Sequence, residues 1–132
     1  MRVVDTSAWI EWLIGSDVGV AVAIDLPELD QWLVPTIVQF ELAKWVAREG
    51  GEKRSDQVIG YTETCVVVEL DTSTALVAAD LSVRHKLAMV DSIIYATALA
   101  HSAELLTCDR HFEGLPGVRF VPNPKAVKPS LN

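Results

Sequence analysis

The chain has 132 residues, of which 50% are hydrophobic and 22% charged, and its formal net charge at pH 7 is −7. This composition predicts one globular domain with a core of its own and excludes an intrinsically disordered chain. The acidic charge argues against a protein that binds nucleic acid through a generally basic surface. Basic residues do cluster locally, which is compatible with a basic rim around an acidic centre: Lys44, Arg48, Lys53 and Arg54; Arg84, His85 and Lys86; Arg110 and His111.

The sequence gives no sign of export or of membrane insertion. No apolar run reaches the roughly 20 residues that span a bilayer. Arg2 is followed by only two apolar residues before Asp5, unlike a secretory signal. Cys65 and Cys108 lie in apolar runs, which is typical of small buried residues in a reducing compartment. We therefore expect a cytoplasmic protein that does not enter a membrane.

The first part of the chain alternates short apolar runs with helical patterns. In order, these predict a strand over residues 2–5, helices over 8–13 and 18–26, and a strand over 32–34. Thr6 and Ser7 are candidate caps for the first helix. Thr36 and Gln39 match a capping box, which predicts a further helix that ends near residue 47 or 48.

The second part continues the alternation. It predicts a helix over residues 52–64, a strand over 65–69, helices over 72–86 and 92–101, and strands over 104–107 and 118–121. Asp80 and Arg84 are expected to pair along one helix. Strands alternating with helices favour parallel pairing with both faces covered. We expect a three-layer α/β/α domain over residues 1–122, with a mostly parallel four- or five-stranded sheet, and a short C-terminal tail over 123–132 that contains proline and lysine.

Four acidic residues stand at informative places. Asp5 and Asp109 follow apolar strand-like runs, Asp91 opens a helical stretch, and Glu41 interrupts an apolar helical face. Acids that follow parallel strands lie at the carboxyl edge of the sheet, where open α/β folds bind ligands. Carboxylates gathered there repel one another unless a cation joins them. The pattern therefore predicts a metal site and, with it, a phosphodiesterase.

Oxygen ligands indicate the kind of metal. Carboxylates suit Mg²⁺ or Mn²⁺ better than Zn²⁺, and the histidines at positions 85, 101 and 111 lack the spacing of a zinc site. The hydroxyls of Thr6, Ser7 and Thr107 lie beside the acids in sequence. We expect these hydroxyls to position a water molecule or a phosphate oxygen.

Each acid also has a purely structural explanation. Asp5 and Asp91 could each be a helix N-cap, and Asp109 could be a turn residue. Glu41 could form a salt bridge with Lys44 on its own helix.

Two other functional interpretations stay open at this point. One is a non-catalytic interaction module, because four tryptophans are many for a small chain and some could lie at a partner surface: Trp9, Trp12, Trp32 and Trp45. The other is a phosphotransfer domain of the receiver or haloacid dehalogenase type. The second acid that such a phosphatase carries two residues after the first is missing after Asp5, where Ser7 stands.

Four motifs together resemble the PIN-domain ribonucleases, and most of all the VapC toxins of bacterial and archaeal toxin–antitoxin pairs. In chain order they are Val-Val-Asp5-Thr6-Ser7-Ala-Trp, Phe-Glu41-Leu, Asp91-Ser-Ile-Ile-Tyr-Ala-Thr-Ala and Leu-Leu-Thr107-Cys-Asp109-Arg-His-Phe112. The resemblance covers the chain from Arg2 to about Val121. It implies a PIN-like fold, an Mg²⁺- or Mn²⁺-dependent endoribonuclease with an RNA substrate, a homodimer or higher assembly, and a VapB-like antitoxin that blocks the active site.

The resemblance also assigns roles to residues. The family's acids map onto Asp5, Glu41, Asp91 and Asp109, all expected to be catalytic and to bind metal. We take Asp5 and Asp91 as the principal ligands, with Asp109 completing the site or holding a second ion and Glu41 binding the metal or orienting a water. Its hydroxyl positions map onto Thr6 or Ser7 and onto Thr107. One departure is that many members carry a further acid where this chain has His111, which removes that extra carboxylate.

Overall fold

Short runs of valine and leucine form the strands of one parallel sheet in the computed structural model, which describes residues 1–124. The five strands are β1 (Arg2–Val4), β2 (Trp32–Pro35), β3 (Val66–Val68), β4 (Glu104–Thr107) and β5 (Val118–Phe120). Each neighbouring pair is parallel. The prediction of four or five mostly parallel strands is therefore confirmed, while residues 125–132 of the expected tail lie outside the described residues.

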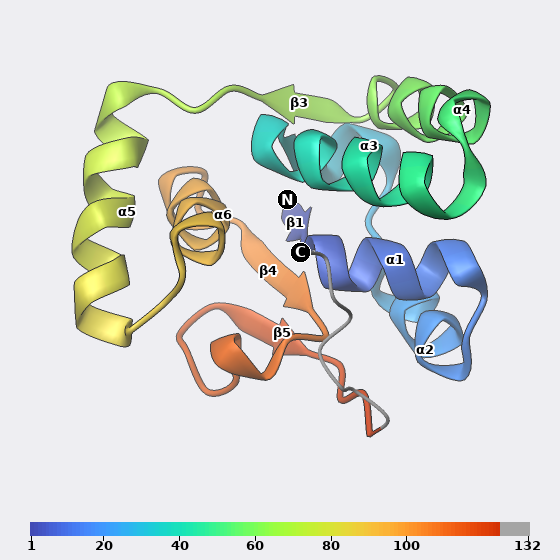
Figure 1. Cartoon of the computed structure of the whole chain (residues 1–132). Helices are drawn as coiled ribbons and strands as arrows, with labels where there is room; N and C mark the ends of the chain where they lie inside the picture. The colour runs from blue at the N-terminus through green and yellow to red at the C-terminus, as the bar shows by residue number, and fades with distance from the viewer. Residues whose placement is uncertain (125–132) are drawn as a thin grey trace.

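Within residues 1–124, six α-helices flank this sheet (Figure 1). They are α1 (Thr6–Ile14), α2 (Asp17–Asp25), α3 (Thr36–Gly50), α4 (Glu52–Thr62), α5 (Thr72–His85) and α6 (Met89–Ala100). Two 3₁₀ turns, η1 (Leu29–Gln31) and η2 (Arg110–Phe112), precede β2 and follow β4. In Figure 1, β4 lies between α6 on one side and α1 on the other. The predicted α/β/α arrangement is confirmed.

The strand order places one pair of strand ends at the centre of the molecule. The order across the sheet is β3-β2-β1-β4-β5. The chain builds outward from β1 to β3 and then returns to add β4 on the other side of β1. Ligands in open α/β sheets bind at such a reversal, beyond the carboxyl ends of the two strands. The residues that follow β1 and β4 are therefore adjacent, and the backbone N–H of Asp5 donates to the carbonyl of Leu106 at 2.8 Å.

The core is apolar on both faces of the sheet and contains two of the four tryptophans. Trp9 and Trp32 are almost completely buried, and their ring centroids lie 4.6 Å apart. Trp12 and Tyr61 pack edge-on or tilted against the same pair. Trp45 is partly buried against the core. Trp9 and Trp32 thus stabilise the fold through large buried aromatic surfaces, rather than forming the partner surface considered for them.

The helix starts differ from the predicted caps. α6 begins at Met89 with Ala88 as its N-cap, so Asp91 lies inside the first turn and does not cap the helix. α3 has Pro35 at its N-cap with no side-chain cap, and Gln39 donates instead to Thr62 Oγ1 at 3.1 Å. At Gln39 a tertiary partner thus prevails over the local capping pattern. The Asp80–Arg84 pair is confirmed, with a 2.6 Å contact.

Within the described part of the chain, no single helix is long and apolar enough to cross a membrane. α1 and α2 reach that length and composition only when taken together, and they are bent by 119° at the break between them.

Gly19 allows the close packing of α2 on α1. A Cβ atom at this position would lie 2.0 Å from the backbone oxygen of Glu11, which is far inside van der Waals contact. We expect Gly19→Ala to lower the free energy of unfolding by about 1–3 kcal/mol through overpacking, measured by urea denaturation.

Gly60 provides the matched control. It lies in α4, and nothing would lie within 4 Å of an added Cβ. Gly60→Ala should raise the free energy of unfolding by about 0.5–1 kcal/mol, because alanine has the higher helix propensity. Equal effects of the two substitutions would contradict the packing explanation for Gly19.

Candidate active site

The predicted acids come from four elements that meet at the carboxyl edge of the sheet. Asp5 directly follows β1, and Asp109 lies two residues beyond β4. Asp91 is in the first turn of α6, and Glu41 lies on α3. Both Asp109 and Glu41 are close enough to Asp5 to act on its charge. The site therefore lies at the strand-order reversal between β1 and β4.

Asp5 is the most deeply buried of the acids, with 3% of its surface exposed. Its Oδ2 accepts hydrogen bonds from Ser7 Oγ at 2.6 Å and from Thr107 Oγ1 at 2.8 Å. Burial raises the pKa of Asp5 from 3.8 to about 6; the two hydroxyls lower this pKa, and the charges of Asp109 and Glu41 raise it. Because both bonds go to Oδ2, the side chain is fixed while Oδ1 takes part in no hydrogen bond within residues 1–124. Although Asp5 precedes α1, its side chain does not cap the helix.

Ser7 and Thr107 each join Asp5 to the turn that follows β4. Thr107 Oγ1 accepts from the backbone N–H of Asp109 at 2.9 Å, and Ser7 Oγ accepts from that of Cys108 at 3.1 Å. The two hydroxyl oxygens lie 3.3 Å apart. These hydroxyls therefore hold the start of α1 and the end of β4 in one arrangement. A role in positioning water or phosphate stays a prediction.

Glu41 is held from another helix. Its Oε1 accepts from Thr6 Oγ1 on α1 at 2.6 Å. The alternative partner, Lys44, is exposed, and no ion pair joins it to Glu41 in the described chain. The bond to Thr6 connects α3 to the residue next to Asp5, so it brings Glu41 to the site.

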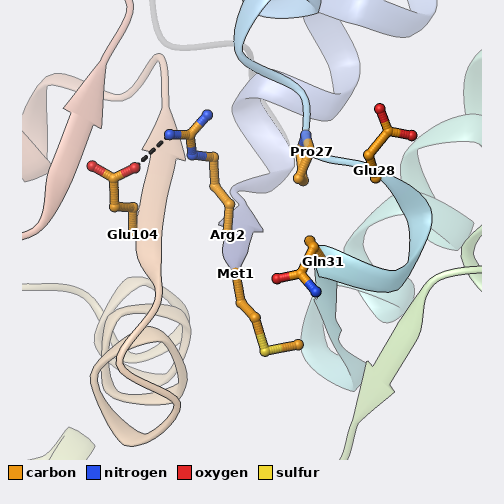
Figure 2. A pocket seen from close by; sticks show the side chains of 6 residues that line it. All are labelled: Met1, Arg2, Pro27, Glu28, Gln31 and Glu104. Atoms are coloured by element: carbon orange, nitrogen blue, oxygen red, sulfur yellow. Dashed lines mark hydrogen bonds and ion pairs between the residues drawn. The ribbon is translucent and has the colours of Figure 1, made fainter.

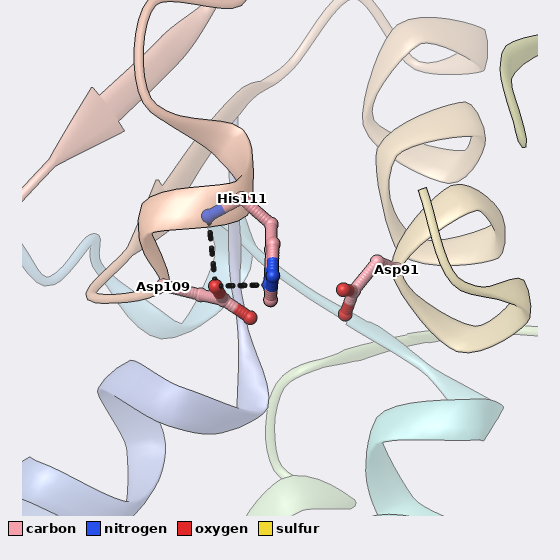
Figure 3. Close-up of side chains that lie close together, drawn as sticks. All are labelled: Asp91, Asp109 and His111. Carbon is pink, nitrogen blue, oxygen red and sulfur yellow. Dashed lines mark hydrogen bonds and ion pairs between the residues drawn. The ribbon is translucent and has the colours of Figure 1, made fainter. Parts of the chain in front are cut away.

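Asp91, Asp109 and His111 form a second part of the site (Figure 3). One potential ligand atom of each residue lies within 4.8 Å of the others. Asp109 Oδ1 accepts from the backbone N–H of His111 at 2.9 Å, and His111 Nδ1 lies 2.9 Å from the same oxygen. Asp109 is thus also the cap of η2, which agrees with its expected place in a turn.

His111 was not among the predicted site residues. Zinc-site spacing concerns several histidines together and has no bearing on a single histidine beside a carboxylate. The useful signal was its position two residues after Asp109, within one turn of η2.

Two other features contribute little to this site. Cys108 is buried, and burial raises the pKa of its thiol to about 12, so it is a small apolar residue rather than a reactive one. A shallow pocket of about 330 Å³ lies at the amino ends of β1 and β4, where Arg2 and Glu104 form an ion pair (Figure 2). It is therefore at the opposite edge of the sheet from the acids.

The donor set fits a divalent cation. Asp109 and Glu41 act on the charge of the buried Asp5, whose pKa is raised. Asp91 and Asp109 each offer a ligand atom within 4.8 Å of the other, and Asp5 and Glu41 lie outside that closest group of described residues. Carboxylate oxygens are the ligands that Mg²⁺ and Mn²⁺ take in proteins. Without a cation these charges would repel one another.

Comparisons with known proteins agree with this geometry. A model of the PIN domain family matches residues 2–118. A toxin–antitoxin complex from Klebsiella pneumoniae contains a chain that is 25% identical, with a TM-score of 0.77, over 90% of this chain and 96% of that chain. No curated protein sequence gives a significant match.

Two further solved structures share the fold at lower identity. The DNA-bound VapBC of Salmonella typhimurium matches with a TM-score of 0.69 and 20% identity, over 90% of this chain and 95% of that chain. VapC20 of Mycobacterium tuberculosis, a sarcin–ricin loop cleaving toxin, matches with a TM-score of 0.73 and 17% identity, over 92% of this chain and all of that chain, 100%. The predicted resemblance to PIN domains is confirmed, and the chain shares its fold with these VapBC and VapC20 structures.

The raised pKa of Asp5 predicts how stability depends on pH in the absence of metal. Because the folded-state pKa of about 6 lies above the unfolded value of 3.8, the native state binds the extra proton between these values. The contribution of Asp5 to stability is thus fully present below about pH 4 and falls by roughly 3 kcal/mol as the pH rises from there through 6.

Asp5→Asn has no such charge. In EDTA we expect the free energy of unfolding of this variant, relative to that of the wild type, to increase between pH 4.5 and pH 8. Urea denaturation of both proteins measures this difference. The other titrating groups are common to both proteins and cancel in this difference. A difference that does not change with pH would contradict the raised pKa of Asp5.

Proposed function

The chain belongs to the PIN domain family, and we propose that it is a metal-dependent endoribonuclease and the toxin of a toxin–antitoxin pair. The observation that carries this proposal is the approach of carboxylates from four separate elements at the reversal of strand order. Asp5 accepts hydrogen bonds from two hydroxyl groups. Asp91 and Asp109 lie close to each other and to His111. A purely structural role for each acid would not require them to meet.

The acids would hold Mg²⁺ or Mn²⁺ in defined roles. Asp5 and Asp91 are the principal ligands and Asp109 completes the set. Glu41, whose Oε1 is engaged by Thr6, offers Oε2 to the cation or to the attacking water. A divalent cation at this site supplies a water of lowered pKa and offsets negative charge on the phosphate.

The hydroxyl residues prepare this arrangement before substrate binds. Ser7 and Thr107 fix one oxygen of Asp5, and Thr107 also fixes the backbone at Asp109. Functional side chains that neighbouring groups already hold lose little freedom when a ligand binds. The geometry of Asp5 is therefore set by the fold rather than by the cation.

An RNA substrate is compatible with an acidic chain. Arg110, next to Asp109, and Lys44, one turn after Glu41, are exposed. Basic side chains beside the site can contact phosphates on either side of the cleaved bond, and such contacts position nucleic acid without reading its sequence.

We also infer a VapB-like antitoxin as partner and a homodimer or higher assembly. The Klebsiella and Salmonella structures are of toxin–antitoxin assemblies. Apolar side chains are exposed on α2 and α5, including Ile24 and Val83, each 82% exposed. Exposed apolar groups of this kind favour contacts with other chains.

RNA cleavage is the direct test. We expect the purified chain, separated from any antitoxin, to cut RNA in total cellular RNA with Mg²⁺ or Mn²⁺ and not with EDTA. Asp91→Asn should lower the rate by at least about 100-fold, because loss of a ligand should exceed the 10–100-fold effect of changes around ligands.

Asp80→Asn is the matched control. Asp80 is exposed on α5 and pairs only with Arg84 in the described structure, so this variant should cut RNA at the wild-type rate. Wild-type activity of Asp91→Asn, or no cleavage by metal-loaded protein, would contradict the proposed function.

Thr107 tests the positioning argument. Thr107→Val removes the hydroxyl that joins Asp5 to Asp109, and we expect Mn²⁺ affinity to fall by about 10–100-fold, as for other residues that orient ligands. Thr107→Ser keeps the hydroxyl, so its Mn²⁺ affinity should stay within about a few-fold of the wild-type affinity. Thr107→Ser loses a methyl group at this buried position, whereas Thr107→Val keeps the shape and loses only the hydroxyl. Titration calorimetry therefore separates orientation from packing. Equal affinities in the two variants would argue against the positioning role.

A further inference from the structure

His111 lies between Asp91 and Asp109 (Figure 3). Its backbone N–H and its ring Nδ1 both contact Oδ1 of Asp109, each at 2.9 Å. The histidine side chain is 58% exposed, while Asp109 is only 11% exposed. The ring is thus attached to the site through Nδ1, while much of the side chain is reachable from solvent.

This contact orients the imidazole. A ring that carries its proton on Nδ1 places it beside the Asp109 carboxylate and keeps the lone pair on Nε2. Histidines that bind metals commonly have their second nitrogen next to a carboxylate, which fixes the ring and makes the ligand more basic. Asp109 is placed to do this for His111 while its other oxygen, Oδ2, is available to a cation.

The three residues offer a mixed set of donors. One atom each from Asp91, Asp109 and His111 lies within 4.8 Å of the others. Mg²⁺ takes oxygen ligands and keeps much of its water, whereas imidazole suits ions of the first transition series. A nitrogen ligand in place of a carboxylate therefore changes which ion is preferred.

We propose that His111 is a nitrogen ligand of the cation held by Asp91 and Asp109, and that it shifts the preference of the site from Mg²⁺ toward Mn²⁺. This inference rests on the metal site of the proposed function. It goes beyond that function because it gives a residue outside the four acids a role in the choice of metal.

Two readouts test the proposal without depending on catalysis. Pulsed electron paramagnetic resonance of the Mn²⁺-loaded full chain should show coupling to one ¹⁴N nucleus. Titration calorimetry with Mn²⁺ and with Mg²⁺ gives the ratio of the two dissociation constants. We expect His111→Gln and His111→Asp to lose the ¹⁴N coupling, and His111→Asp to lower the preference for Mn²⁺ over Mg²⁺ by about tenfold, on the scale typical of changes around metal sites.

His101→Gln is the matched control. His101 is exposed at the C-terminal end of α6, where its Nδ1 lies 3.0 Å from the carbonyl oxygen of Thr97. This variant should keep both the ¹⁴N coupling and the metal preference. Absence of ¹⁴N coupling in the wild type, or an unchanged preference in His111→Asp, would overturn the proposal.

RNA cleavage measured on the same samples separates the two proposals. Cleavage without ¹⁴N coupling would refute His111 as a ligand and leave the ribonuclease assignment standing. Nitrogen coupling without cleavage would support His111 as a ligand and contradict the ribonuclease assignment. Failure to bind Mn²⁺ at all would overturn both.

Discussion

The hydrogen bond from Thr107 Oγ1 to Asp5 Oδ2 is the interaction on which the site depends. It joins the ends of β1 and β4, which are neighbouring strands in the sheet. The two bonded residues are 102 positions apart in the sequence. The same hydroxyl accepts the backbone N–H of Asp109. One buried oxygen therefore sets the position of two acids, one on each side of the strand-order reversal. Parallel pairing makes this meeting possible, because it brings both carboxyl ends to one edge.

The same arrangement opposes folding. Asp5 is buried beside other carboxylates, and its pKa of about 6 measures how unfavourable its charged form is there. Residues gathered for chemistry often lower stability, and the rest of the fold must compensate. Here Trp9, on the helix that follows Asp5, packs against Trp32 of β2, and this buried aromatic pair supplies apolar surface that stabilises the fold. A cation would remove the repulsion, so metal binding and folding support one another.

The sheet and the places of the acids relative to its strands could be predicted because their signals are repeated along the chain, while the catalytic and metal-binding roles of the acids stay predictions. Apolar runs marked every strand, and acids directly after two of them marked the carboxyl edge. Tertiary hydrogen bonds between side chains could not be predicted in this way, although the local Asp80–Arg84 pair could. Gln39 matched a capping box but donates to Thr62 of another helix, and Glu41 has Thr6 as its partner rather than Lys44. These partners are distant in sequence, and only the packed fold brings them close enough to compete with local ones.

The two parts of the site differ in how firmly the fold fixes them. Asp5 is immobilised by two hydroxyls within the core, so a change there disturbs packing and charge together. Asp109 and His111 belong to a short turn after β4, and the histidine reaches solvent. A substitution at position 111 changes a donor atom while leaving the sheet and its core intact. In the proposed metal site the strand-end acids would therefore determine where a cation binds, and the turn after β4 is where its identity could be tuned independently of folding.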